Sequence, residues 1–168
     1  MLFFTDMALV FASGESGDGA VEIGSAAVRR PGRDVGLIAY AKSVPACLQA
    51  AEALAERGIE AEVVDLRTLK PLDETTVLAS VRRTGRAVVV HEASRTCGVG
   101  AEVAATIAEK AFGKLVAPVL RVTGPDAPVA ASSPLEQAFA PQPERIAAAA
   151  EGLVRSGTSA GTPAVTAA

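Results

Sequence analysis

The fold of this chain is decided by the run Val63-Val64-Asp65-Leu66-Arg67-Thr68-Leu69-Lys70-Pro71-Leu72-Asp73 and, one helix length later, by Thr84-Gly85-Arg86-Ala87-Val88-Val89-Val90-His91-Glu92-Ala93. Each run contains a short apolar strand that ends in polar residues. Strands that alternate with helix-sized segments are typical of parallel sheets, because a crossover must return the chain to the same edge. The pattern therefore predicts an α/β domain with polar side chains along the carboxyl edge of its sheet.

The same alternation continues on both sides of this stretch. The continuous apolar run at 35–40 predicts a strand, and the three- and four-residue spacing of apolar positions over 44–55 predicts a helix. Further strands are expected at 59–66, 86–90 and 118–122, and further helices after Asp73, after Gly98 and from Pro143. The loosely alternating 21–28 predicts a short first strand, whereas the proline-rich 124–141 is expected to be irregular.

Composition limits the classes of partner and compartment. The chain has 168 residues, a formal net charge of -3 and two cysteines, Cys47 and Cys97. Lys and Arg are spread through the sequence, so we expect no nucleic-acid partner. No apolar stretch reaches the roughly 18 residues of a membrane span, so we expect no membrane partner. Two cysteines without metal-ligand spacing favour a reducing compartment, and we therefore expect a cytoplasmic protein.

Four motifs occur in order and identify a family. They are Asp65-Leu66-Arg67-Thr68-Leu69-Lys70-Pro71-Leu72-Asp73, the turn Thr84-Gly85-Arg86, His91-Glu92-Ala93 followed by Gly98-Val99-Gly100-Ala101-Glu102, and Arg121-Val122-Thr123-Gly124-Pro125-Asp126-Ala127-Pro128. With them the stretch 21–155 resembles the C-terminal domain of transketolase-like enzymes. The similarity is strongest to the beta subunit of thiamine-diphosphate-dependent 2-oxoacid dehydrogenases of the pyruvate or branched-chain type.

The resemblance implies a three-layer α/β/α sandwich around a mixed, mostly parallel five-stranded sheet. Its first strand would be antiparallel and its strand order 1-3-2-4-5. On this basis the domain is expected at 21–156. The small and polar residues of 157–168 predict a disordered tail, because they offer too little apolar surface to offset the cost of ordering. Residues 1–20 would be an apolar stub and linker, the remnant of a preceding pyrimidine-binding domain.

The resemblance also implies that the parent enzyme uses thiamine diphosphate and magnesium, held by two other domains. Gly17-Asp18-Gly19 matches the tripeptide with which the family holds the metal. However, no strand precedes it, and the sequence contains no asparagine to complete such a site. We therefore expect the match to be a coincidence, with no cofactor and no metal bound by this chain.

The candidate site residues are Lys42, Arg67, His91 and Glu92, which follow the predicted strands. The implied strand order reverses between the strands that end at Tyr40 and Val90, so Lys42 and the His91-Glu92 pair are expected to face one crevice. His91 is the only histidine. It could act in acid-base chemistry if Glu92 orients its ring, or both residues could hydrogen-bond loops at an interface. The interface interpretation is preferred, and no catalytic residue is assigned.

Other candidates have simpler structural interpretations. Arg67 could bind a ligand, but its planar fork is expected to clamp a carboxylate across loops. Gly98 and Gly100 could approach a pyrophosphate at a helix start, although a turn that needs positive φ explains them as well. A redox role is not expected for Cys97, because Arg95 is its only nearby cation. A hydrolase is not expected either, because Ser43 and Ser94 do not lie in a Gly-x-Ser-x-Gly nucleophile elbow.

The preferred hypothesis is an assembly and docking domain of a decarboxylating 2-oxoacid dehydrogenase beta subunit, inactive alone. Its expected partners are a second copy of itself, the alpha subunit or the missing cofactor-binding domains, and the lipoyl acyltransferase core of the complex. One alternative is an independent flavodoxin-like binder or enzyme for a small molecule, with a site near Lys42 and His91. Another is a regulatory interaction domain that has diverged from the enzyme family.

Overall fold

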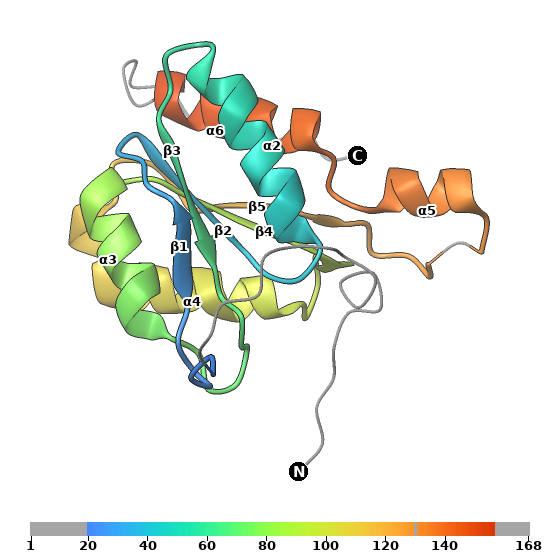
Figure 1. Ribbon diagram of the computed structural model, residues 1–168, viewed down its shortest axis with the longest axis horizontal. Coiled ribbons are helices and arrows are strands. Elements are labelled where there is room, and N and C mark those ends of the chain that lie inside the picture. Colours follow the sequence, from blue (N-terminus) through green and yellow to red (C-terminus); the bar gives the residue numbers. More distant parts are fainter. Residues whose placement is uncertain (1–19, 130, 157–168) are drawn as a thin grey trace.

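The computed structural model describes residues 20–129 and 131–156, in which strands and helices alternate along the chain (Figure 1). The elements are β1 (Ala27–Arg30), β2 (Val35–Ala39), α2 (Ser43–Ala55), β3 (Ala61–Asp65), α3 (Glu74–Thr84), β4 (Ala87–Ser94), α4 (Val99–Ala111), the short 3-10 helix η1 (Phe112–Lys114), β5 (Leu120–Gly124), α5 (Ser133–Phe139) and α6 (Pro143–Ser156). The expected tail at 157–168 and all but the last residue of the expected stub at 1–20 lie outside the described residues.

The five strands form one mixed sheet in the order β1-β3-β2-β4-β5. β1 pairs with β3 in antiparallel fashion, and the other three pairings are parallel. Helices α3 and α4 cover one face of the sheet and α2 and α6 cover the other, as Figure 1 shows. The three-layer sandwich, the mixed sheet and the strand order expected from the sequence are confirmed.

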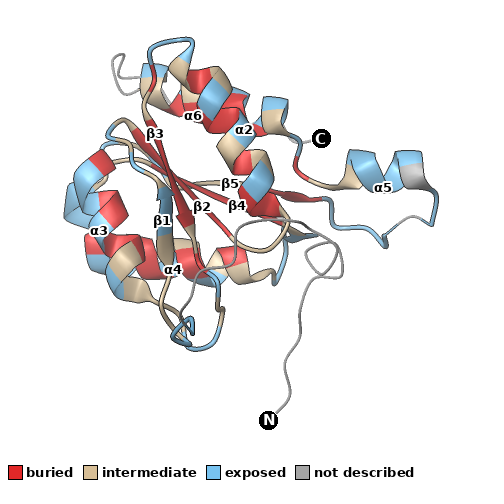
Figure 2. Cartoon of the chain, in the orientation of Figure 1, coloured by how far each residue is buried: buried red, intermediate tan, exposed pale blue. Residues whose placement is uncertain are grey.

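Alternate residues of the central strand, β2, belong to two separate hydrophobic cores, because successive side chains of a strand point to opposite faces of the sheet. Leu37 lies in the core beneath α2 and α6, together with Leu54 and Leu153. Ile38 lies in the core beneath α3 and α4, together with Ile107. All five side chains are fully buried, and the buried residues run along the strands in Figure 2. The continuous apolar run at 35–40 is thus a strand covered on both faces.

The first strand begins later than the sequence predicted. The expected strand at 21–28 is instead a turn at Gly24 (φ 87°) followed by β1. The turn is tied to the loop after β3: the backbone N–H of Gly24 donates to Thr68 Oγ1 (3.1 Å), and that of Ala26 donates to Asp73 Oδ2 (3.0 Å). These backbone donors are used by side chains of another loop and not by a neighbouring strand.

A helix occupies part of the stretch predicted to be irregular. α5 begins after Ser132 with a proline in its first turn, which is a common start for a helix. Figure 2 shows α5 standing away from the sandwich, with most of its residues coloured as exposed. Apolar periodicity could not reveal this helix, because α5 has no buried face that would need one.

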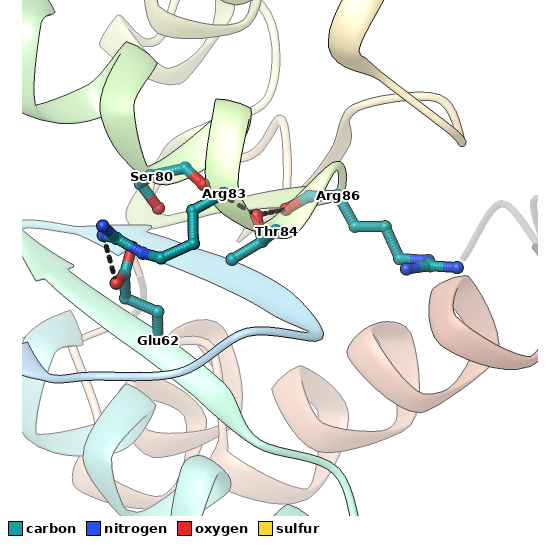
Figure 3. Close-up of polar contacts among 5 residues, drawn as sticks. All are labelled: Glu62, Ser80, Arg83, Thr84 and Arg86. Atoms are coloured by element: carbon teal, nitrogen blue, oxygen red, sulfur yellow. Dashed lines mark hydrogen bonds and ion pairs between the residues drawn. The ribbon is translucent and has the colours of Figure 1, made fainter.

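A buried acid near the amino end of β3 was not singled out from the sequence. Glu62 is 1% exposed, and its Oε2 accepts a hydrogen bond from the Arg83 guanidinium of α3 (Figure 3). Thr84 donates to the Ser80 and Arg86 carbonyl oxygens (3.0 and 2.9 Å). Glu62 Oε1 and the Ser80 hydroxyl have no hydrogen-bond partner among the described residues. This cluster ties α3 to the sheet at the edge opposite Lys42.

We expect Arg83→Ala to lower the free energy of unfolding by about 3 kcal/mol, because it leaves the buried Glu62 carboxylate without its cation. The lower end of the usual range is expected, since the Arg83 side chain is about half exposed. Arg82→Ala is the matched control, because Arg82 lies beside Arg83 on α3 with an exposed side chain. Urea unfolding of the two variants measures the difference, and equal stabilities would contradict a structural role for the pair.

Candidate functional site

The carboxyl edge of the sheet carries tight loops and a cleft. Three non-glycine residues of the described chain adopt positive φ, and each lies in a loop at this edge. They are Ala41 (φ 50°) after β2, Arg67 (φ 56°) after β3 and Cys97 (φ 59°) after β4. A cleft of about 400 Å³ opens between these strand ends and α5. It is lined by Tyr40, Lys42, Glu92, Ala93, Ser94, Ala127, Pro128, Val129, Glu136, Phe139 and Ala140.

Lys42 and Glu92, which both line the cleft, form an ion pair with each other. Lys42 Nζ lies 2.5 Å from Glu92 Oε2, and about a third of each side chain is exposed. Both residues also line a smaller hollow of about 250 Å³ beside α6. The sequence correctly placed Lys42 and Glu92 in one crevice. The expectation that Glu92 could orient the His91 ring is wrong, because its carboxylate turns toward Lys42.

His91 does not line the cleft. Its side chain is fully buried and stacks on Tyr40, with ring centroids 5.9 Å apart and planes 14° apart. Neither ring nitrogen has a hydrogen-bond partner among the described residues. Burial lowers the pKa of His91, the nearby Arg121 cation lowers the pKa further, and a weak interaction with the Ala93 backbone partly opposes both. His91 is therefore a neutral side chain that packs in the interior. The prediction that it faces the same crevice as Lys42 is wrong.

Gly98 and Gly100 are needed for space around that ring. A Cβ on Gly100 would lie 2.2 Å from His91 Nε2, and one on Gly98 would lie 2.3 Å from the Ser94 carbonyl oxygen and 2.8 Å from His91 Cε1. Gly98 itself is extended (φ -70°, ψ 152°), so the expectation that positive φ explains both glycines is wrong. The positive φ of this turn falls on Cys97. Because glycine has no side chain, the first turn of α4 can pack directly against the buried imidazole.

Arg67 does not clamp a carboxylate among the described residues. Its side chain is exposed, and its backbone N–H donates to Asp65 Oδ1 (3.0 Å). The loop is held instead by Thr68, whose hydroxyl donates to the Pro71 carbonyl (3.0 Å), and by Asp73. Asp73 caps α3: its carboxylate accepts from the Thr76 N–H (3.0 Å) and hydroxyl (2.7 Å). Burial opposes ionisation, but these hydrogen bonds lower the pKa of Asp73 overall.

The described residues do not fit thiamine diphosphate with its metal. A hard divalent cation needs several oxygen ligands, and no group of three or more His, Cys, Asp or Glu within 20–129 and 131–156 could hold one. Of the acids that line the cleft, Glu92 is already paired with Lys42. Gly17-Asp18-Gly19 lies outside the described residues. In the part of the chain that the structure describes, no helix is long and apolar enough to cross a membrane.

We expect Gly100→Ala to destabilise the domain by about 1–3 kcal/mol, because the new methyl group would overlap the His91 ring. Gly152→Ala in α6 is the matched control, since nothing lies within 4 Å of its added Cβ. That change should stabilise the protein by about 0.5–1 kcal/mol through helix propensity. Chemical denaturation compares the two, and stabilisation by both changes would contradict the packing around His91.

The pH dependence of stability should also report on His91. Its folded pKa lies below the ordinary 6.5, so the unfolded chain binds a proton more readily as the pH falls below that value. The free energy of unfolding should therefore decrease as the pH falls from 6.5 toward the folded pKa. His91→Leu, which cannot titrate, should lose this part of the slope. Identical slopes in urea denaturation series of the two proteins would contradict a buried, neutral His91.

Comparison with known proteins places this geometry in a family. Residues 24–146 match the family described as "Transketolase, C-terminal domain". The chain is 46% identical over 138 residues to the acetoin:2,6-dichlorophenolindophenol oxidoreductase subunit beta of Cupriavidus necator, covering 82% of this chain and 41% of that protein. It is 51% identical over 106 residues to the pyruvate dehydrogenase E1 component subunit beta of Bacillus subtilis, covering 63% and 33%.

A solved structure supports the same assignment. The structure described as "Split gene transketolase, inactive beta4 tetramer" matches with a TM-score of 0.75 and 30% sequence identity, covering 86% of this chain and 46% of that one. This chain thus spans less than half the length of these relatives. The matched residues include every strand of the sheet and the loops at its carboxyl edge. The chain belongs to the transketolase C-terminal domain family, and its relatives include beta subunits of pyruvate dehydrogenase and of the acetoin oxidoreductase.

Proposed function

We propose that this chain is the C-terminal assembly domain of the beta subunit of a decarboxylating 2-oxoacid dehydrogenase. In the whole enzyme, a 2-oxoacid would lose carbon dioxide and its acyl group would pass to a lipoyl acyltransferase. This domain would hold the cofactor-bearing domains in position and would contribute no catalytic residue. Its similarity to beta subunits of pyruvate dehydrogenase and the acetoin oxidoreductase supports this proposal.

The observation that carries the proposal is that the polar groups named at the carboxyl edge are either paired with one another or buried. Lys42 binds Glu92, the Thr96 backbone N–H and hydroxyl bind Asp126, and His91 is sealed beneath α4. A catalytic edge would need such groups free to meet a substrate. Groups that are paired or buried suit a surface that positions other domains.

Three partners follow from this role. One is a second copy of the chain, a proposal supported by the related structure described as a "beta4 tetramer". Another is the alpha subunit, together with the cofactor-binding domains of the parent enzyme. The third is the acyltransferase core. In this proposal Lys42 and Glu92 belong to the contact surface of the carboxyl edge.

The alternative of an independent small-molecule binder retains only part of its site. The cleft supplies Lys42, but the buried His91 cannot reach a ligand there. Lys42 is moreover neutralised by Glu92 at 2.5 Å, which weakens its use as an anion anchor. The assembly proposal requires no such anchor and is the one we retain.

Isothermal titration calorimetry with thiamine diphosphate and magnesium tests the proposal that other domains bind the cofactor and this domain does not. The chain should show no binding heat, because its cleft lacks the oxygen ligands for a metal diphosphate. The paired alpha and beta subunits of the Bacillus subtilis pyruvate dehydrogenase E1 component serve as the positive control. Micromolar binding to this chain alone, or release of carbon dioxide from a 2-oxoacid, would contradict the proposal.

A further inference from the structure

We propose that one buried water molecule bridges Glu62 on β3 and Ser80 on α3 and completes the polar cluster at the amino end of the sheet. This site is independent of the proposed assembly function. Two buried polar atoms point to it, Glu62 Oε1 and Ser80 Oγ, because neither has a hydrogen-bond partner among the described residues. Water is the fitting ligand, since one molecule can donate to the carboxylate and also bond the hydroxyl.

The two unpartnered atoms lie in one place between α3 and the sheet. Gly36 is in register with Glu62 on the neighbouring strand, so both residues face the same side of the sheet. A Cβ on Gly36 would lie 2.7 Å from Ser80 Oγ, which puts that hydroxyl directly over the strand beside Glu62. Figure 3 shows Ser80 on the same side of α3 as the Arg83–Glu62 pair. The two atoms are thus near neighbours that do not bond each other directly.

The other side-chain donors of the cluster are engaged elsewhere. The Arg83 guanidinium binds the second carboxylate oxygen of Glu62, Oε2. The Thr84 hydroxyl donates to the Ser80 and Arg86 carbonyl oxygens (3.0 and 2.9 Å). The Arg86 guanidinium points away from Glu62 in Figure 3. Because a buried carboxylate oxygen without a donor is costly, an ordered water is the remaining way to satisfy Glu62 Oε1.

Small side chains around Glu62 provide the room for this molecule. The row of the sheet that holds Glu62 continues with the small residues Gly36 and Ala87. The next row on the same face consists of three β-branched residues, Val64, Ile38 and Val89. Less side-chain volume therefore lies beneath the last turn of α3 than beneath its middle. The Arg83 side chain over Glu62 is 48% exposed, so the site lies just below the surface, where water can exchange.

A crystal structure of the full chain, at a resolution that shows ordered water, tests the site without any substitution. The expected result is one density peak within about 2.5–3.2 Å of both Glu62 Oε1 and Ser80 Oγ. A direct hydrogen bond between the two side chains would overturn the proposal, as would a peak that contacts only one of them. Crystals grown with rubidium chloride separate water from a monovalent cation, and a rubidium ion at the peak would also overturn it.

Urea unfolding of variants tests the same bridge in solution. Ser80→Ala and Glu62→Gln should each lower the folding equilibrium constant by at least about tenfold. Because both side chains act through one water, the double variant should lose less than the product of the two single losses. Ser80→Ala combined with Glu102→Gln is the matched control, since Glu102 is exposed on α4, and its losses should multiply. Losses that multiply in both pairs would overturn the bridge, and the wild-type crystal decides if a variant fails to fold.

Discussion

The close approach of α4 to the buried His91 ring is the constraint on which the carboxyl edge depends. Glycine at 98 and 100 leaves room for the imidazole, and Tyr40 stacks on it. Because the ring is buried without a hydrogen-bond partner in the described chain, the charged imidazolium is disfavoured. The one histidine of the sequence therefore closes the edge by packing, where an imidazole facing solvent would have provided an acid or a base.

Because His91 is buried, the groups that stay accessible at the carboxyl edge belong to its neighbours. Glu92, the next residue along β4, points away from the ring and neutralises Lys42. The loop after β4 is joined to the loop after β5 through Thr96 and Asp126. What stays open is a cleft whose walls are partly apolar and whose outer wall is α5. Such an edge is suited to contact with a protein surface, which agrees with a family whose beta subunits work in multi-subunit enzymes.

Much of the fold could be predicted from the sequence, because β2 and the first half of β4 are continuous apolar runs and the helices between the strands have clear periodicity. The four motifs supplied the strand order, which periodicity alone could not. Prediction failed where side chains from distant loops take over the backbone, as Asp73 and Thr68 do before β1. It also failed at α5, which has no buried stripe to detect.

Site residues were predicted by position better than by role. Lys42 and Glu92 were expected in one crevice and lie there, yet their pairing with each other depends on side-chain directions that spacing does not determine. The glycines at 98 and 100 were noticed for the wrong reason, since the atoms they accommodate come from another strand. Glu62 was missed because its partner Arg83 lies 21 positions away, and no local pattern links a strand residue to the end of the next helix.

The most direct test of this account is a nuclear magnetic resonance titration of the His91 ring, which no other histidine obscures. A sealed ring should keep neutral-imidazole shifts below pH 6.5, the ordinary pKa of histidine, until the domain begins to unfold. A ring that titrates near 6.5 while the domain stays folded would mean that His91 is open to solvent. The carboxyl edge would then be available for chemistry, and the account would be wrong.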